Sequence, residues 1–384
     1  MSIVYVDNNA TTKVAPEVID AMLPFLNNYW GNPSSIHTFG GQVAKHIDEA
    51  RGSIATILGA SSPSEIIFTS CGTESDNAAI RSALAASPEK RHIITSSVEH
   101  PAVLNLVKKL ERDGYGASYL KVDADGNLDI SELERAITSQ TAIVSIMWAN
   151  NETGVIFPIK KIAEICSERG VPLHVDAVQA LGKLPINMAE TPVTYLSVSG
   201  HKVHAPKGVG ALYVRKGTPF HPLLIGGHQE KGRRGGTENV ASIVAFGRAC
   251  ELAMDDMKSE IRRMELLRDR LETGLLSSIK KSFVHGNTKS RLPNTTNIGF
   301  EGIEGEAILL MMNEHGICAS SGSACTSGSL DPSHVMIAMG IPFTRAHGSI
   351  RFSLSRYNSD GEIDFILEKL PSIIERLRAL SPFC

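Results

Sequence analysis

The feature that most constrains the fold is an alternation of short apolar runs with helical stretches between about residues 60 and 215. The spacing predicts helices from about residue 74 to 84 and from Pro101, a residue that suits the first turn of a helix. Strands that alternate with helices predict a mostly parallel α/β sheet, whose ligands bind beyond the carboxyl ends of the strands. The predicted strands are residues 66–69, 92–95, 141–147, 173–176, 195–198 and 210–214.

The remainder of the chain predicts a second, smaller domain. Residues 239–281 have apolar side chains at helical spacing, which predicts a long helical hinge between two domains. The last hundred residues mix helices with predicted strands at 297–300 and 349–353. For a chain of 384 residues we therefore expect a large domain over 15–257 and a small α+β domain formed by 1–14 and 258–384.

Composition narrows the class of protein. The chain is 42% hydrophobic and 21% charged with a net charge of -3, which is typical of a globular protein and gives no indication of nucleic-acid binding. Neither a secretory signal nor an apolar run long enough to span a bilayer is visible, so we expect a cytoplasmic protein without membrane contact. The six cysteines are scattered, which argues against a disulfide framework.

Polar residues follow the first two predicted strands. Gly72 and Thr73 open a helix, where free N–H groups favour an anion, although Thr73 and Asp76 also fit a simple capping box. His100 follows the next strand and has two interpretations. It suits stacking on an aromatic cofactor or moving a proton, but a lone loop histidine often does neither.

Three further strand ends carry candidate residues. Asn151 lies in a turn after the longest strand, where asparagines either shape the turn or orient a ligand. Asp176 ends an apolar strand, where a carboxylate needs a partner. That partner is either a pyridinium N–H or a structural hydrogen bond, and Gln179 follows three residues later. Lys202 lies among small residues beside His201, which suits Schiff-base chemistry, although most loop lysines are simply solvated. Because such strand ends meet at one sheet edge, a shared site is favoured over separate structural roles.

Five stretches together resemble the class V aminotransferase group of fold-type I pyridoxal-phosphate (PLP) enzymes. They are residues 7–12 (DNNATT), 72–77 (GTESDN), 174–179 (HVDAVQ), 199–202 (SGHK) and 234–239 (RGGTEN). Residues 321–328 (SGSACTSG) resemble the cysteine desulfurase signature, and the C-terminal part is similar to the NifS branch more than to the IscS branch of that family. The resemblance implies a fold-type I enzyme with a mostly parallel seven-stranded sheet flanked by helices.

The resemblance also implies roles for individual residues. Lys202 is the expected Schiff-base lysine, and His100 is expected to stack on the ring and act as acid and base. Asn151 and Arg351 are expected to bind the substrate, with Arg351 on its carboxylate. The expected cofactor-binding residues are Gly72, Thr73, His100, Asn151, Asp176, Gln179, Ser199, Gly200, His201, Lys202 and, from the partner subunit of a homodimer, Thr237.

Cys325 is the expected sulfur acceptor. Its Gly/Ser-rich surroundings favour an accessible, mobile thiol, whereas Cys318 is predicted to lie in the core. The expected reaction takes L-cysteine to L-alanine and a Cys325 persulfide. Its sulfur is expected to pass to a scaffold of the NifU type for iron–sulfur cluster assembly related to nitrogenase. No metal site is expected, apart from Cys325 as an iron–sulfur ligand during transfer.

Other functions remain open from sequence. Transamination, or lysis of selenocysteine or cysteine sulfinate, uses the same fold, and a plain aminotransferase needs no cysteine in that loop. A non-catalytic scaffold or sulfur carrier is a further alternative, which intact Lys202 and Asp176 argue against.

Overall fold

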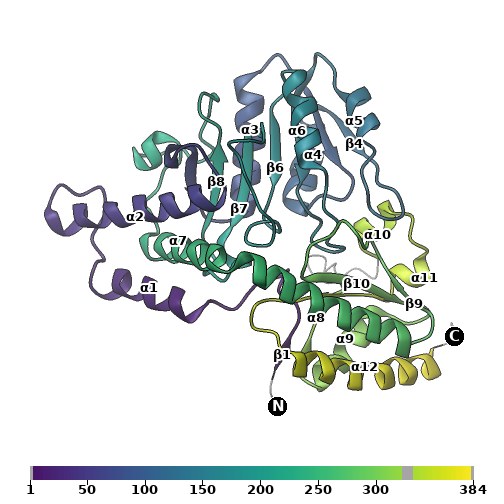
Figure 1. The fold of residues 1–384 in the computed structure, drawn as a ribbon. Helices are drawn as coiled ribbons and strands as arrows, with labels where there is room; N and C mark the ends of the chain where they lie inside the picture. The colour runs from purple at the N-terminus through teal and green to yellow at the C-terminus, as the bar shows by residue number, and fades with distance from the viewer. Residues whose placement is uncertain (1–2, 322–331, 382–384) are drawn as a thin grey trace.

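A computed structural model describes residues 3–321 and 332–381. Its largest element is a seven-stranded sheet with the order β2-β8-β7-β6-β5-β3-β4 (Figure 1). Only β8 runs against the other strands, because both of its pairings are antiparallel while β3 to β7 pair in parallel. The expected mostly parallel seven-stranded sheet is confirmed. The strands are β2 Ile66–Thr69, β3 His92–Ser96, β4 Gly116–Leu120, β5 Thr141–Met147, β6 Leu173–Asp176, β7 Tyr195–Ser199 and β8 Gly210–Val214.

Helices cover both faces of this sheet, which explains why its central strands are apolar on both sides. All seven residues of β5 are buried, as expected for a strand enclosed by two helical layers. Neighbouring residues of one strand enter different clusters: Ile66 and Phe68 pack with helices α2, α6 and α7, whereas Ile67 packs with α3 and α4. The helices are α1 Pro16–Asn27, α2 Thr38–Ile57, α3 Gly72–Ala86, α4 Pro101–Arg112, α5 Ile130–Ala136, α6 Ile159–Glu168 and α7 Val240–Asp255.

The predicted helical stretch 239–281 is two helices. It breaks at Asp256, whose φ of -140° is not helical, and α8 Met257–Ser278 continues beyond the break. In Figure 1 α7 and α8 follow each other from the large sheet towards the C-terminal part.

A second apolar cluster lies in that C-terminal part. A three-stranded antiparallel sheet of the order β12-β10-β9 packs with α8, α9 and α12, and β1 pairs in parallel with β11. Val4 and Val6 belong to this cluster, whereas Val335 and Met336 pack into the larger one. The domain boundaries given above stay a prediction. The elements are β1 Val4–Tyr5, β9 Ser282–Val284, β10 Thr295–Phe300, α9 Gly305–Glu314, β11 Ile317–Cys318, α10 His334–Ala338, α11 Phe343–Ala346, β12 Ser349–Ser353 and α12 Asp360–Leu380.

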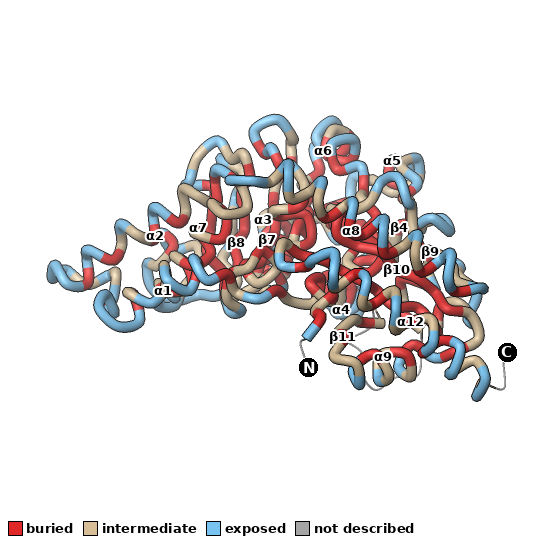
Figure 2. The backbone as a smooth tube through the Cα atoms, turned by 60° about the horizontal axis from the view of Figure 1, so that its bottom comes forward, coloured by how far each residue is buried: buried red, intermediate tan, exposed pale blue. Residues whose placement is uncertain are grey.

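Burial follows this layering (Figure 2). The strands are mostly buried, while α1 and the first half of α2 project from the body and carry much exposed surface. Three single-turn 3-10 helices, Pro63–Glu65, Gly200–Lys202 and Gln229–Gly232, complete the described structure. No helix of the described residues is both long and apolar enough to cross a membrane.

Candidate active site

The strand ends meet around a cavity of about 270 Å³. Ten of the residues singled out from the sequence line it: Gly72, Thr73, His100, Asn151, Asp176, Gln179, Ser199, His201, Lys202 and Arg351. Gly200 and Thr237 are not among its lining residues within the described chain. Asn9, Ala10, Cys71, Asp76, Met147, Ala149 and Val178 complete the lining.

The start of α3 forms one end of the cavity. Its N-cap, Cys71, has no side-chain capping bond, so the capping-box interpretation of Thr73 and Asp76 is wrong. The first-turn N–H groups of a helix lack intrahelical partners and attract anions. Nearby, the buried Ser199 hydroxyl has no hydrogen-bond partner among the described residues. This end of the cavity therefore suits a phosphate group.

Asp176 is the last residue of β6, and it lines the cavity. Its Oδ1 accepts a hydrogen bond from the Val178 N–H at 2.9 Å. Burial, followed by the nearby Asp76 charge, raises the pKa of Asp176 to about 6. A cationic ring N–H would reverse this shift, because an opposite charge favours the carboxylate. A pyridinium nitrogen is thus a suitable partner.

Beneath Asp176 lies a buried polar network that the sequence did not reveal. His174 shares a hydrogen bond with the Ser145 hydroxyl at 2.8 Å through Nδ1 and one with the Ser197 hydroxyl at 2.9 Å through Nε2. Burial lowers the pKa of His174 to about 4, so the ring is neutral. Asp76 Oδ1 lies 3.4 Å from His174 Nε2, and burial raises the pKa of Asp76 to about 7. The sequence signal that could have revealed this network is His174 itself, a polar residue within the apolar part of β6.

His100 has a structural contact that the sequence interpretation did not include, and it also lines the cavity. It is the N-cap of α4, and its Nδ1 accepts a hydrogen bond from the Ala102 N–H at 3.1 Å. An accepting Nδ1 carries no proton, so in the neutral ring the proton resides on Nε2. The cap therefore fixes the tautomer of a histidine that faces the site.

Lys202 reaches the cavity from the 3-10 helix after β7. Its Nζ donates hydrogen bonds to the Asn9 carbonyl at 2.5 Å and the Ala10 carbonyl at 2.8 Å. The N-terminal segment thus forms one wall of the site. Its carbonyl groups had no role in the sequence interpretation, because a backbone acceptor leaves no side-chain signal.

Arg351 extends from β12 and is 3% exposed. Its guanidinium donates to the Asn151 carbonyl at 2.9 Å and to the Asp7 carboxylate at 2.6 Å. Its buried Nε has no partner among the described residues. Asn150, by contrast, is structural, since its side-chain oxygen accepts from the N–H groups of Glu152 and Thr153.

The cysteines divide into three kinds. Cys325 falls outside the described residues, so its position relative to the cavity stays a prediction. Cys166 and Cys250 are buried, and burial raises the pKa of Cys166 to about 12. Cys318 is half-buried in β11 and is not part of the second apolar cluster, so its predicted core position is wrong. Neighbouring side chains of a strand point to opposite faces, so Ile317 is buried while Cys318 is only half-buried.

Comparison with known proteins places this site in a family. The aminotransferase class-V model matches residues 4–366, so the chain belongs to that family. A cysteine desulfurase of Trichormus azollae is 62% identical over 383 residues, covering 100% of this chain and 96% of the relative. The cysteine desulfurase NifS of Azotobacter vinelandii is 55% identical, covering 100% and 95%.

Solved structures agree with these relatives. A "NifS-like protein" superposes with a TM-score of 0.92 at 40% identity, covering 98% of this chain and 100% of its own. A structure described as "SspA in complex with cysteine" gives a TM-score of 0.82 at 36% identity, covering 92% and 99%. The expected fold-type I architecture is confirmed, as are PLP dependence and the cysteine desulfurase class.

The residues present fit PLP. The uncapped α3 terminus and the unpartnered Ser199 hydroxyl suit the phosphate, and the Asp176 carboxylate suits a protonated ring nitrogen. Lys202 presents a primary amine to the same cavity. These groups approach the cavity from different strand ends, as a flat, phosphorylated cofactor requires.

Proposed function

We propose that this cavity removes sulfur from L-cysteine, giving L-alanine and a persulfide on Cys325. The observation that carries the proposal is the meeting of Lys202, Asp176 and Arg351 around one cavity. These residues supply an amine for the cofactor, a carboxylate for its ring nitrogen and a cation for the carboxylate of an amino acid. The relative described as bound to cysteine supports this substrate.

The proposed cofactor contacts follow the geometry of the site. Thr73, Ser199, His201 and the Gly72 backbone would hold the phosphate, with Gly200 shaping the turn. Asp176 would pair with the ring nitrogen and Gln179 with the ring oxygen. PLP, when bound, withdraws electrons from the Cα of the attached amino acid.

The chain's own groups would then bind the substrate and move protons. Arg351 would bind the substrate carboxylate, and Asn151 would help to orient it. His100 would stack on the ring, and its neutral form would carry the proton on Nε2 because Nδ1 accepts from the Ala102 N–H. Lys202 Nζ would carry a proton to or from Cα, held meanwhile by the Asn9 and Ala10 carbonyls.

Cys325 would complete the transfer. Its thiolate attacks the substrate sulfur, so an S–S bond forms while the substrate C–S bond breaks. The three-carbon remainder gains protons and leaves as alanine, and the sulfur remains as the Cys325 persulfide. Cys325 could also ligate an iron–sulfur cluster during delivery.

We further propose a homodimer. Exposed apolar side chains lie on α1 and in the connection from residue 28 to 37 that leads to α2, where Trp30 is 70% and Ile36 fully exposed. Large exposed apolar patches mark interaction surfaces. The loop from residue 224 to 237 adds Ile225 at 88% exposure, and the exposed Thr237 lies on the same loop. Thr237 would then reach the phosphate of the partner subunit.

The name of the Azotobacter relative supports a finer role. We propose that the sulfur serves iron–sulfur clusters of nitrogenase through a scaffold of the NifU type. A cytoplasmic location stays a prediction. Pull-down with a NifU-type scaffold, followed by transfer of labelled sulfur from the persulfide, tests the acceptor.

The reaction itself is tested by supplying L-cysteine and measuring alanine, sulfide and protein persulfide. Lys202→Ala should lack the visible PLP absorption and all activity. Cys325→Ala should lose the persulfide and nearly all sulfide release under reducing conditions, whereas the matched control Cys318→Ala should retain both. Full sulfide release by Cys325→Ala would refute the role of Cys325. A preference for selenocysteine over cysteine would reassign the substrate.

A further inference from the structure

Lys183 is a buried lysine that lies beside the site but has no part in the chemistry described above. It follows β6 by seven residues, and its side chain is 7% exposed. Its Nζ donates a hydrogen bond to Gln179 Oε1 at 2.9 Å. Burial of an amine without a hydrogen bond costs free energy. The contact between Lys183 and Gln179 therefore restrains the orientation of both side chains.

The contacts of Gln179 fix the orientation of its amide. Its Nε2 donates to the Asn9 carbonyl at 3.0 Å, while its Oε1 accepts from Lys183 Nζ. A carbonyl oxygen only accepts, so the Gln179 atom that faces the Asn9 carbonyl must be the N–H donor. Oε1 is then left to accept from Lys183 Nζ, and turning the amide over would oppose two oxygens at the Asn9 end. The network therefore sets which atom of Gln179 is the donor.

The Asn9 carbonyl links this amide to Lys202. It accepts from Gln179 Nε2 at 3.0 Å and from Lys202 Nζ at 2.5 Å. Lys183 is thus two hydrogen-bonded groups away from the amine of the site. Burial, followed by the charges of Lys202 and Arg351, lowers the pKa of Lys183 to about 7.

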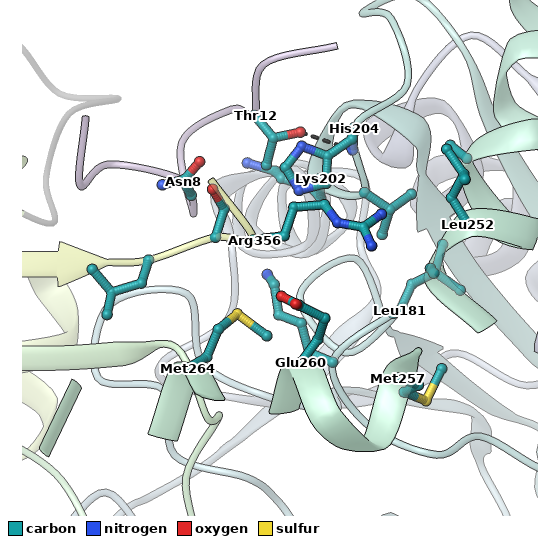
Figure 3. Close-up of a pocket in the computed structure, with 17 residues that line it drawn as sticks. Asn8, Thr12, Leu181, Lys202, His204, Leu252, Met257, Glu260, Met264 and Arg356 are labelled. Carbon is teal, nitrogen blue, oxygen red and sulfur yellow. Dashed lines mark hydrogen bonds between the residues drawn. The ribbon is translucent and has the colours of Figure 1, made fainter. Parts of the chain in front are cut away.

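A second cavity, of about 60 Å³, adjoins these residues. Lys183 lines it, and Lys202 lines both cavities. Figure 3 shows Lys202 beside Thr12 and His204, with Arg356 and Glu260 on the same cavity. The space can hold a few water molecules or a slightly larger side chain. It gives Lys183 room for conservative replacement.

We propose that Lys183 is a positioning residue that holds the Gln179 amide with its N–H groups available to the ring oxygen of PLP. The inference rests on the proposed function, in which Gln179 contacts that oxygen. Lys183 itself touches neither cofactor nor substrate. It acts by supplying the donor that Gln179 Oε1 would otherwise lack.

The first test measures PLP binding to cofactor-free protein by absorbance titration. Lys183→Met should weaken binding about tenfold, the scale of one lost hydrogen bond to a charged group, and shift the absorption maximum of bound PLP. Lys183→Arg keeps the donors, has room in the adjoining cavity, and should bind within about threefold of wild type. Lys207→Met, which removes an exposed lysine, is the matched control and should bind PLP as wild type does.

The melting temperature of the cofactor-free protein separates positioning from a merely structural role. Lys183→Met should melt close to wild type, because removal of a buried amine offsets the cost of leaving Gln179 Oε1 without a donor. A lower melting temperature with unchanged PLP affinity would overturn the proposal. Lys183→Gln, which is one atom shorter and should not reach Gln179, is the second variant if Lys183→Met does not fold.

A double-mutant cycle with Gln179→Leu tests the link directly. Lys183→Met should add nothing to the weakening of PLP binding already caused by Gln179→Leu. Independent, multiplying losses would overturn the inference and leave the proposed function intact. If Gln179→Leu alone binds PLP as wild type does, the proposed role of Gln179 fails and the inference fails with it.

Discussion

Arg351 and Asp7 form a buried ion pair in which Arg351 Nη2 donates to Asp7 Oδ1 at 2.6 Å. The two side chains are 3% and 18% exposed, respectively. Asp7 also forms a parallel bridge with Ser353 of the same strand as Arg351. The anion that balances the proposed substrate-binding cation therefore comes from the opposite end of the chain.

Removal of this anion should destabilise the protein. Asp7→Ala leaves the buried Arg351 charge without its carboxylate, so we expect a loss of about 2–3 kcal/mol in the free energy of unfolding. Urea denaturation measures this loss. Asp48→Ala, which removes the exposed partner of Arg51, is the control and should cost less than about 0.5 kcal/mol. Equal losses in the two variants would contradict the buried-pair argument.

The unpartnered hydroxyl of Ser199 should matter for cofactor binding and not for folding. Ser199→Ala should leave the melting temperature of cofactor-free protein unchanged, because that hydroxyl has no partner to lose. It should weaken PLP binding about tenfold, measured by absorbance titration. Ser197→Ala, which removes a partner of His174, should instead lower the melting temperature. A lowered melting temperature in Ser199→Ala alone would contradict this assignment.

PLP affinity should depend on pH through Asp176. Burial raises the pKa of Asp176 to about 6 in the cofactor-free site, and the ring nitrogen requires the ionised form. Affinity should therefore be constant above pH 6 and fall as the pH drops below 6, because a proton must first leave the carboxylate.

Asp176→Asn isolates this effect. The variant should bind PLP more weakly at pH 7.5 and lose the part of the pH dependence that is due to Asp176. The phosphate of PLP also titrates near pH 6, and the variant retains that contribution. Dissociation constants measured from pH 5 to 8 give the comparison. The same slope in both proteins would rule out Asp176 as its source.

The contact of α2 with α7 offers a test of packing that is independent of the active site. A Cβ on Gly247 would lie 2.6 Å from the Ala50 Cα, whereas one on Gly52 would meet nothing within 4 Å. Gly247→Ala should destabilise the protein by about 1–3 kcal/mol through overpacking. Gly52→Ala should stabilise it by about 0.5–1 kcal/mol through helix propensity. Thermal or urea unfolding of both variants measures the difference, and a neutral Gly247→Ala would contradict the close approach.

Much of the large sheet was predictable because its strands are buried on both faces. The bounds of β5 and β6 match the predicted runs, since both are mostly apolar segments and are fully buried. Strand β4 was missed because Gly116–Leu120 is a half-buried strand with a glycine and a serine. The predicted hinge is two helices in the structure. The break at Asp256 was not predicted because it involves neither glycine nor proline.

The candidate residues were predictable at strand ends, but their partners were not. A lysine or an aspartate after a strand is visible in the sequence, as Lys202 and Asp176 were. The pairing of Arg351 with Asp7 joins residues 344 positions apart, and the acceptors of Lys202 are backbone carbonyl groups. Such contacts depend on how the two apolar clusters come together, which local pattern does not determine.

The pairing of β1 with β11 has a consequence for synthesis on the ribosome. Val4 pairs with Ile317, and Asp7 bridges Ser353, so residues 4–7 find these partners only after residues 317 and 353 have been made. Until then the segment that carries the Asn9 and Ala10 carbonyl groups lacks both pairings, although its contacts with Gln179, His201 and Lys202 can already form. The seven strands of the large sheet all precede residue 215, so the sheet is encoded long before the wall beside Lys202 gains its partner Ser353.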